Sequence, residues 1–310
     1  MISDTQKSFA VLESRGIVSL RGADARDFLQ GLVTNDIGRV SPEQAVWTAM
    51  LTPQGKYLFD FFVIEMMGAL VLDCEAARAG DLVKRLTMYK LRSNVDISDD
   101  SEDWAVLALV GTEADGDALC EFEGRAGAFA GGVCFVDPRY GGAGARAILP
   151  REAIEQLKAA GFEEADAEAY DTHRLICGLP DASRDLVPEK SFPMENGFDE
   201  LHAIAWDKGC YVGQELTARM RYRATAKKVL LPVEIAGEAP APGTLITQGT
   251  KDAGEMRSSC GKIGLALLRI EALEALQTGG DGLVAGTAQV TPMRPPYMKA
   301  GGGEGENRPN

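Results

Sequence analysis

The residues best suited to chemistry lie in one stretch, DKGCYVGQELTARMRYR, from Asp207 to Arg223. Cys210 stands there between Gly209 and Gly213, and glycine adopts turn conformations that are closed to other residues. From about Val212 the sequence is compatible with a helix, so the thiol would lie at or just before a helix N-terminus. The positive end of the helix dipole favours the thiolate there. The sequence therefore predicts that Cys210 is a reactive thiol on a turn.

The same stretch ends in closely spaced cations. If RMRYR is extended, Arg219, Arg221 and Arg223 share one face. Lys227 and Lys228 bring the total to five cations in ten residues. Such a face could bind the carboxylates or phosphates of a ligand. The alternative is a solvated, charged connector between domains.

Composition narrows the class of protein. The chain has 310 residues, 45% of them hydrophobic, and a net charge of −14, which argues against general nucleic-acid binding. Its six cysteines form no C-x-x-C pair and only two histidines are present, which argues against a structural zinc site or a disulfide framework. We find no long apolar run and no leader-like start, so the sequence predicts a cytoplasmic protein that does not bind membranes.

Periodicity predicts an α+β protein of two or three compact units. Residues 56–74 indicate two strands joined at Met67-Gly68, and 76–90 indicate a helix. Further strands are expected near 104–111, 133–139 and 145–150, and helices at 151–161 and 167–177. The stretch from Asp181 to Asp199 is expected to be irregular. After Arg223, short strands separated by Gly and Pro predict a small all-β domain.

The string KGCYVGQE, Lys208 to Glu215, resembles the signature of the YgfZ/GcvT-like family. The blocks FLQGLVTND, TPQGKYLFDFFV, KLRSNVDI and RLICGLPD resemble other family blocks, in the expected order. The resemblance implies an aminomethyltransferase-like folate-binding fold of two interleaved α+β units around a cavity, followed by a small β-barrel. The expected domains are 1–225 and 226–298, with a flexible tail at 299–310.

The resemblance also implies a function. It indicates a tetrahydrofolate-binding factor for assembly or repair of iron-sulfur (4Fe-4S) proteins, acting through Cys210 with iron-sulfur client or carrier proteins as partners. A 4Fe-4S cluster normally takes four thiolates, so any cluster would be transient and shared with a partner. The anionic tail of the folate is expected on the cations from Arg219 to Lys228. The candidate site residues are Cys210 and Asp60 for chemistry, and Gln54, Lys56, Arg174, Lys208, Tyr211, Gln214, Arg219, Arg221 and Arg223 for the cofactor.

Two departures from the aminomethyltransferase pattern leave alternatives open. That enzyme has two adjacent aspartates where this chain has Phe59-Asp60. It also has an acidic pair where this chain has the loop from Arg139 to Arg146, which contains no acidic residue. One carboxylate is then missing for proton transfer. A folate-dependent one-carbon transferase that uses Asp60, and a folate-sensing adaptor without chemistry, remain the competing interpretations.

Overall fold

The computed structural model describes residues 8–110, 122–223 and 225–298. A five-stranded sheet forms the first layer, in the order β3-β4-β5-β2-β6. Its strands are β2 (Arg15–Arg21), β3 (Val46–Leu51), β4 (Tyr57–Met66), β5 (Ala69–Glu75) and β6 (Asp96–Asp99). The helices that follow these strands are α1 (Ala25–Gln30) and α2 (Ala79–Lys90), with 3-10 turns at Ile37–Arg39 and Ala76–Arg78. The predicted strand pair with its turn at Met67-Gly68 is confirmed.

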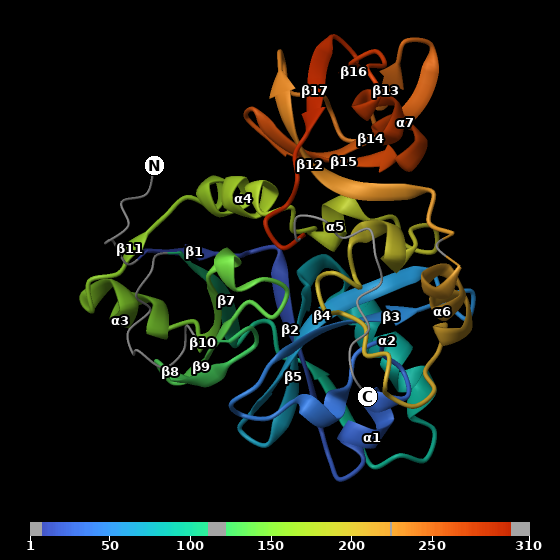
Figure 1. Cartoon of the computed structure of the whole chain (residues 1–310). Helices are drawn as coiled ribbons and strands as arrows, with labels where there is room; N and C mark the ends of the chain where they lie inside the picture. Colours follow the sequence, from blue (N-terminus) through green and yellow to red (C-terminus); the bar gives the residue numbers. More distant parts are fainter. Residues whose placement is uncertain (1–7, 111–121, 224, 299–310) are drawn as a thin grey trace.

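The second sheet has six strands in the order β11-β1-β7-β10-β9-β8. Its strands are β1 (Ser8–Val11), β7 (Trp104–Val110), β8 (Ala126–Phe129), β9 (Gly132–Val136), β10 (Ala145–Pro150) and β11 (Glu163–Glu164), with α3 (Ala153–Ala159) and a 3-10 turn at Gly141–Ala143 alongside. The first strand of the chain thus lies in the second sheet and the next strand lies in the first. This crossing confirms two interleaved α+β units (Figure 1).

The main core lies between the two sheets. It contains Trp47 and Phe62 from the first sheet, Phe135 from the second, and Phe198 from the segment that follows them. The Trp47 and Phe198 rings are 4.4 Å apart between centroids. Because β4 is buried along both faces, its alternate residues contribute to two different cores.

A closed barrel of six strands forms the C-terminal unit, as predicted. Its elements are β12 (Lys228–Ala236), β13 (Leu245–Gln248), β14 (Lys251–Cys260), β15 (Ile263–Arg269), α7 (Ile270–Gln277), β16 (Leu283–Ala285) and β17 (Ala288–Pro292). The barrel lies above the sheets, and α4 (Ala167–Ile176) and α5 (Ala182–Asp185) lie between them (Figure 1).

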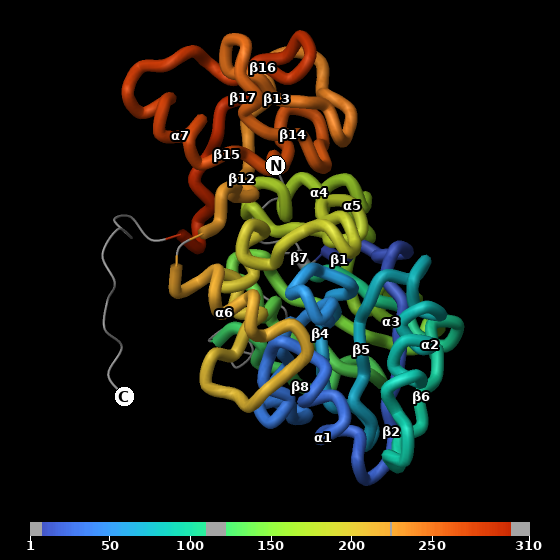
Figure 2. The backbone as a smooth tube through the Cα atoms, turned by 90° about the vertical axis from the view of Figure 1, so that its right-hand side faces the viewer, coloured from blue at the N-terminus to red at the C-terminus, as the bar shows by residue number. Residues whose placement is uncertain are grey.

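The stretch from Asp181 to Asp199 is more regular than predicted. It contains α5 and a 3-10 helix at Pro193–Asn196, and Leu186 and Phe198 are buried in the main core. The prediction failed because these elements are only four residues long, too short to show a helical period. The next helix, α6 (Gln214–Tyr222), lies at the edge of the body below the barrel (Figure 2).

The turn after α2 holds a leucine in a conformation that suits glycine. Leu91 has φ 46° and ψ −106°, Ser93 N donates to Lys90 O across the turn, and the Leu91 side chain is 88% exposed. These angles are close to those of the first central residue of a type II′ turn, where glycine is preferred. The exposed side chain contributes little packing to offset the strain.

We therefore expect Leu91→Gly to raise the free energy of unfolding by about 1 kcal/mol. A strained backbone costs about 1–3 kcal/mol, and the greater entropy of glycine in the unfolded chain offsets part of the relief. Urea unfolding of purified protein measures the change. Leu91→Ala is the control, because it removes the side chain and keeps the strain. An equal gain from alanine would contradict the prediction.

Candidate functional site

A cavity of about 740 Å³ lies where both sheets meet α4, α5 and the barrel. Arg15, Asp60 and Phe62 line it from the first sheet, and Arg146 from the second. The barrel closes one side with the hairpin at residues 259–261, between β14 and β15. This volume is within the range of pockets for drug-sized ligands, roughly 300–1,000 Å³.

Asp60 is a buried carboxylate on the cavity wall. Its oxygens accept hydrogen bonds from Trp47 Nε1 at 2.9 Å and from the Tyr57 hydroxyl at 3.1 Å. Both donors are neutral, and no ion pair to Asp60 is found in residues 8–110, 122–223 and 225–298. The carboxyl oxygens of Asp60 therefore keep acceptor capacity for a ligand that offers a hydrogen-bond donor.

Phe59 does not stand where a second cavity acid would be. Successive side chains of a strand point to opposite faces, so Phe59 is buried in the core on the other side of the sheet, below the Arg78 guanidinium at 4.2 Å. The sequence predicts that a carboxylate for proton transfer is missing at this position. In this chain an acid at position 59 would leave the cavity unchanged, so that part of the argument against transfer chemistry was wrong.

Three arginines surround the Phe62 ring beside the cavity. The guanidinium carbons of Arg15, Arg139 and Arg146 lie 5.9, 5.0 and 4.2 Å from the ring centroid. Asp73 bridges Arg15 at 2.6 Å and Arg146 at 3.1 Å. The loop from Arg139 to Arg146 has no acid of its own, yet Arg139 is buried against Asp137 just before the loop and Arg146 against the distant Asp73. Sequence analysis missed this network because its ion pairs span up to 73 residues.

The cavity arginines change the acidity of their aspartate partners. Burial alone would raise the pKa of Asp137, but the charge and hydrogen bonds of Arg139 outweigh it, and the pKa is lower than usual. The pKa values of Asp171 and Asp181 are lowered in the same way, by neighbouring arginines that include Arg184, against the effect of burial.

These shifts predict loss of stability in acid. An aspartate whose pKa is lower in the folded than in the unfolded chain stabilises the fold at pH values above about 3.9, its unfolded pKa, and loses this contribution as the pH falls through the folded value. We expect the midpoint of urea unfolding to be steady near pH 6 and to fall steeply below about pH 4. An unchanged midpoint down to pH 3 would contradict this expectation.

Arg174 lies in the interior rather than on the surface. It is 2% exposed and donates to Asp171 at 2.5 Å, Asp185 at 2.9 Å, Leu179 O at 3.0 Å and Ser258 Oγ at 2.9 Å. Contact with the cofactor stays a prediction for Arg174. Although Arg174 borders the cavity, its guanidinium mainly ties α4 to α5 and to the barrel.

Cys210 is exposed, four residues before α6 begins. Gly213 has φ 87° at the N-cap, and an added Cβ there would lie 2.6 Å from Thr52 O. The turn containing Gln54 and Lys56 therefore packs directly against the start of α6. The thiol has no hydrogen bond or ion pair within the described part of the chain, which leaves it open to a partner.

Lys208 holds this segment in place. Its Nζ donates to the carbonyl oxygens of Gln30, Val33 and Asn35, each at 2.7 Å. Burial lowers the pKa of Lys208 to about 8, although Asp36 partly opposes the shift. Lys208, which the sequence predicts as a cofactor-binding residue, thus donates its side-chain hydrogen bonds to backbone carbonyl oxygens. Tyr211 is buried in the main core, and burial raises its pKa to about 12.

The three arginines at the end of the motif do not form one face. Residues 214–222 are helical, so Arg219 and Arg221 are about 200° apart around the axis. Arg219 pairs with Glu215 at 3.2 Å, and Arg221 pairs with Asp199 at 3.4 Å. The extended interpretation was wrong because RMRYR has no apolar period that could distinguish strand from helix.

The structure separates the candidate residues into two places. Asp60 and Arg174 line the cavity, whereas none of the described residues from Asp207 to Arg223 does. The second place is the start of α6 near Cys210, where the turn at Gly55 carries Gln54 and Lys56 and the helix begins with Gln214. The predicted folate-tail site on α6 is therefore not part of the cavity wall.

Sequence analysis also missed a second thiol, Cys260, on the cavity rim. Its Sγ is 3.1 Å from Thr172 Oγ1 and 3.4 Å from Glu168 Oε1. Burial raises its pKa, against the hydrogen bond with Thr172. In the described ranges we find no group of three or more residues suited to hold a metal, and no helix long and apolar enough to cross a membrane.

Comparison with known proteins decides the family. Residues 10–121 match the GCVT N-terminal domain, and residues 227–300 match the CAF17 C-terminal beta-barrel domain. The mitochondrial iron-sulfur cluster assembly factor IBA57 of Mus musculus is 32% identical over 93% of this chain and 86% of the relative. The chain belongs to the IBA57 family. IBA57 of Homo sapiens is also 32% identical, over 85% of this chain and 78% of its own length.

A solved structure agrees on the fold. The glycine cleavage system aminomethyltransferase T of Bartonella henselae superposes with a TM-score of 0.74 at 14% identity, covering 95% of this chain and 87% of that one. The GcvT-like resemblance is thereby confirmed, while the relatives named above are IBA57 rather than YgfZ.

The predicted cytoplasmic location is contradicted by these relatives, which are mitochondrial by name. The prediction was drawn from the start of the sequence and from the lack of a long apolar run, and neither feature identifies a compartment.

Proposed function

We propose that this IBA57-family chain is an iron-sulfur cluster assembly factor that binds a reduced folate in its cavity and acts on cluster transfer through Cys210. The observation that carries the proposal is the exposed thiol on the family motif, since relatives are named for cluster assembly. One thiol cannot hold a 4Fe-4S cluster alone, so the partner, an iron-sulfur carrier or client, must supply the other ligands.

The cavity residues fit a reduced folate. A pterin ring offers N–H groups that could donate to Asp60, whose hydrogen-bond partners in the described residues are the neutral side chains of Trp47 and Tyr57. Phe62 and the arginines beside it provide a flat, cationic wall. Tetrahydrofolate would bring a one-carbon carrier into the cavity, and the chain itself would orient it and exclude water.

The role of the thiol is tested in cells that lack their own copy of the gene. We expect Cys210→Ser to fail to restore the activity of 4Fe-4S enzymes. Cys260→Ser, which changes a second thiol that is partly exposed in the described ranges, should restore it. Normal 4Fe-4S activity with Cys210→Ser would exclude the proposed role of Cys210.

The folate is tested separately by calorimetry with tetrahydrofolate. Loss of a hydrogen bond to a charged group costs about 1.5–3 kcal/mol, so we expect Asp60→Asn to weaken binding by at least about tenfold. Absence of binding to the unaltered chain would remove folate from the proposal.

Two further outcomes separate the alternatives. Transfer of a methylene group from an aminomethylated lipoyl carrier to tetrahydrofolate would support a one-carbon transferase that uses Asp60. Folate affinity that survives Cys210→Ser, together with normal 4Fe-4S activity, would support a folate-sensing adaptor.

A further inference from the structure

The turn that carries Cys210 has little backbone support of its own. Residues 207–210 connect Trp206 and Tyr211, which both pack against the main core. Within the described part of the chain, the backbone of residues 207–210 makes no hydrogen bond to other backbone groups. A Cβ added at Gly209 would meet nothing within 4 Å. Side chains therefore decide whether this turn is fixed or moves freely.

Lys208 supplies a buried contact for the turn. Its Nζ donates at 2.7 Å to each of three carbonyl oxygens, those of Gln30, Val33 and Asn35. An ammonium group has three N–H donors, so all of them are used, and hydrogen bonds from a charged donor are stronger than neutral ones. The Asp207 side chain pairs only with Arg39, at 3.3 Å, and such exposed pairs contribute about 0–1 kcal/mol. Lys208 is thus the stronger of the two side-chain contacts.

The carbonyl groups that accept from this ammonium belong to a loop that is itself held by the first sheet. Thr34 N donates to Ala49 O at 2.9 Å, and Asn35 Nδ2 donates to Trp47 O at 2.8 Å. Both acceptors lie on β3. The ammonium therefore joins the turn to a central strand of the fold rather than to another surface loop.

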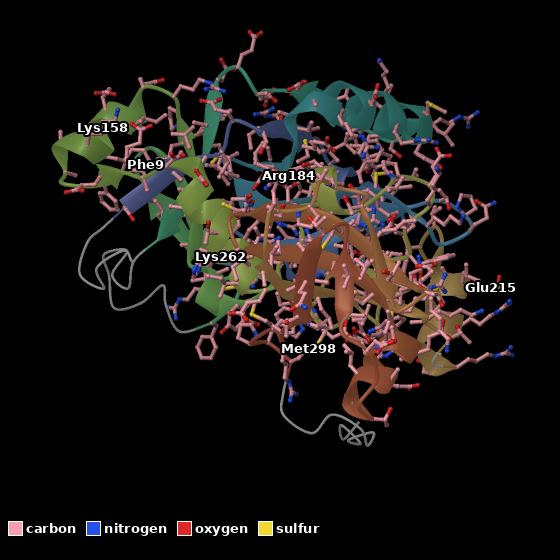
Figure 3. All side chains as sticks on the ribbon, turned by 90° about the horizontal axis from the view of Figure 1, so that it is seen from above. Phe9, Lys158, Arg184, Glu215, Lys262 and Met298 are labelled. Atoms are coloured by element: carbon pink, nitrogen blue, oxygen red, sulfur yellow. The ribbon has the colours of Figure 1, made fainter. Side chains whose placement is uncertain are left out.

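The turn lies away from the cavity. It leads into α6, and Glu215 near the start of this helix lies at the outer edge of the molecule in Figure 3, apart from Arg184 of the cavity wall. None of the described residues from 207 to 223 lines the cavity. A ligand in the cavity would not touch the turn, so its position depends on contacts such as those of Lys208.

We propose that Lys208 is a positioning residue for Cys210, because its ammonium fixes the exposed turn to the first sheet and so holds the thiol at one place on the surface. The use made of the thiol rests on the proposed function, whereas the anchor rests on the contacts described above. Misplacing a reacting group by about 1 Å can cost on the order of 100-fold in rate. An anchor of this kind supports a thiol that makes no hydrogen bond within the described ranges.

The anchor is tested by electron paramagnetic resonance with a nitroxide label on Cys210. The label is attached to a chain with Cys120→Ser and Cys260→Ser, in which the cysteines other than Cys210 are buried. We expect the broad spectrum of an immobilised label when Lys208 is present. In Lys208→Met, which keeps an apolar stem and removes the ammonium, the rotational correlation time of the label should be at least about threefold shorter, since free surface segments move within nanoseconds.

A matched lysine and a chemical rescue provide the controls. Lys84 is exposed on α2 and pairs with Asp81 at 3.3 Å, so Lys84→Met should leave the spectrum unchanged. Lys208→Ala lacks the end of the side chain, which n-propylammonium can replace in carbon number and charge. We expect n-propylammonium to restore the broad spectrum of Lys208→Ala, and n-propanol, which has a similar shape without the charge, to leave it narrow.

A narrow spectrum in the chain that keeps Lys208 would overturn the proposal even if the variants failed to fold. An unchanged spectrum in Lys208→Met, or equal effects of n-propylammonium and n-propanol, would also overturn it. In cells that lack their own copy of the gene, we expect Lys208→Met to lower the activity of 4Fe-4S enzymes at least about threefold. Full activity despite a mobile label would contradict the positioning role. Normal activity with Cys210→Ser would instead remove the proposed function and leave the spectra unaffected, so the two failures are distinguishable.

Discussion

Replacing Gly213 by alanine is expected to lower the free energy of unfolding by about 2–5 kcal/mol, the sum of a strained left-handed backbone and forced overpacking. Gly213 has φ 87°, and an alanine Cβ would lie 2.6 Å from Thr52 O and 2.9 Å from the Leu51 Cβ. Both neighbours belong to the first sheet or its turn and cannot move away easily. Urea unfolding measures the loss.

Gly209 provides the matched control. It lies on the other side of Cys210, and an added Cβ would meet nothing within 4 Å. We expect Gly209→Ala to change stability by less than about 0.5 kcal/mol, as surface substitutions usually do. The sequence analysis treated the two glycines alike, whereas the structure requires glycine at Gly213 alone of this pair. Equal losses in both variants would contradict this distinction.

The Gly213 variant should also alter Cys210. Since Gly213 packs against the turn at Gly55, displacement at this point should move the segment that carries the thiol. We expect the rate at which Cys210 reacts with a neutral disulfide reagent to change in Gly213→Ala and to stay the same in Gly209→Ala.

Replacing Asp185 by alanine is expected to cost about 3–5 kcal/mol, the usual loss when one partner of a buried ion pair is removed. Asp185 is fully buried, and its oxygens accept from Arg174 Nη1 at 2.9 Å, Asp181 N at 2.8 Å, and Ser258 N and Oγ at 2.9 and 2.5 Å. Alanine would leave two buried backbone N–H groups without their acceptor and would remove one of the two carboxylates that pair with the buried Arg174 guanidinium. Because Ser258 belongs to β14, the loss should also loosen the barrel against the cavity.

An exposed ion pair supplies the comparison. Asp81 and Lys84 are 3.3 Å apart on the surface of α2, and such pairs contribute about 0–1 kcal/mol. Asp81→Ala should therefore leave the unfolding midpoint nearly unchanged. A double variant, Arg174→Met with Asp185→Ala, should regain part of the stability that Asp185→Ala loses, because it removes a buried charge that would keep only Asp171 as its carboxylate partner. If the double variant were less stable than Asp185→Ala, the buried charge would not be the cause of the loss.

Regular elements with clear apolar periods could be predicted from the sequence. The strand pair around Met67-Gly68, the helices at 76–90 and 167–177, and the β-rich C-terminal domain all match the structure closely. Local sequence dictates these elements because one face of each must be apolar at the period of its backbone. The segment RMRYR lacks such a period, and it is helical as the continuation of α6, whose first residues pack against the turn near Gly55.

The sequence by itself determined the α+β class, the terminal barrel and Cys210 as the candidate thiol, because strand and helix periods and a rare eight-residue motif are local properties of the chain. Only the tertiary structure decided that Asp60 and Arg174 lie at a cavity away from Cys210, that Lys208 binds backbone carbonyls, and that the arginines of α6 face different ways. The physical reason is that partners such as Asp73 and Arg146, or Arg174 and Ser258, are joined by folding across many intervening residues. No local pattern records such contacts, so burial and pairing are properties of the fold.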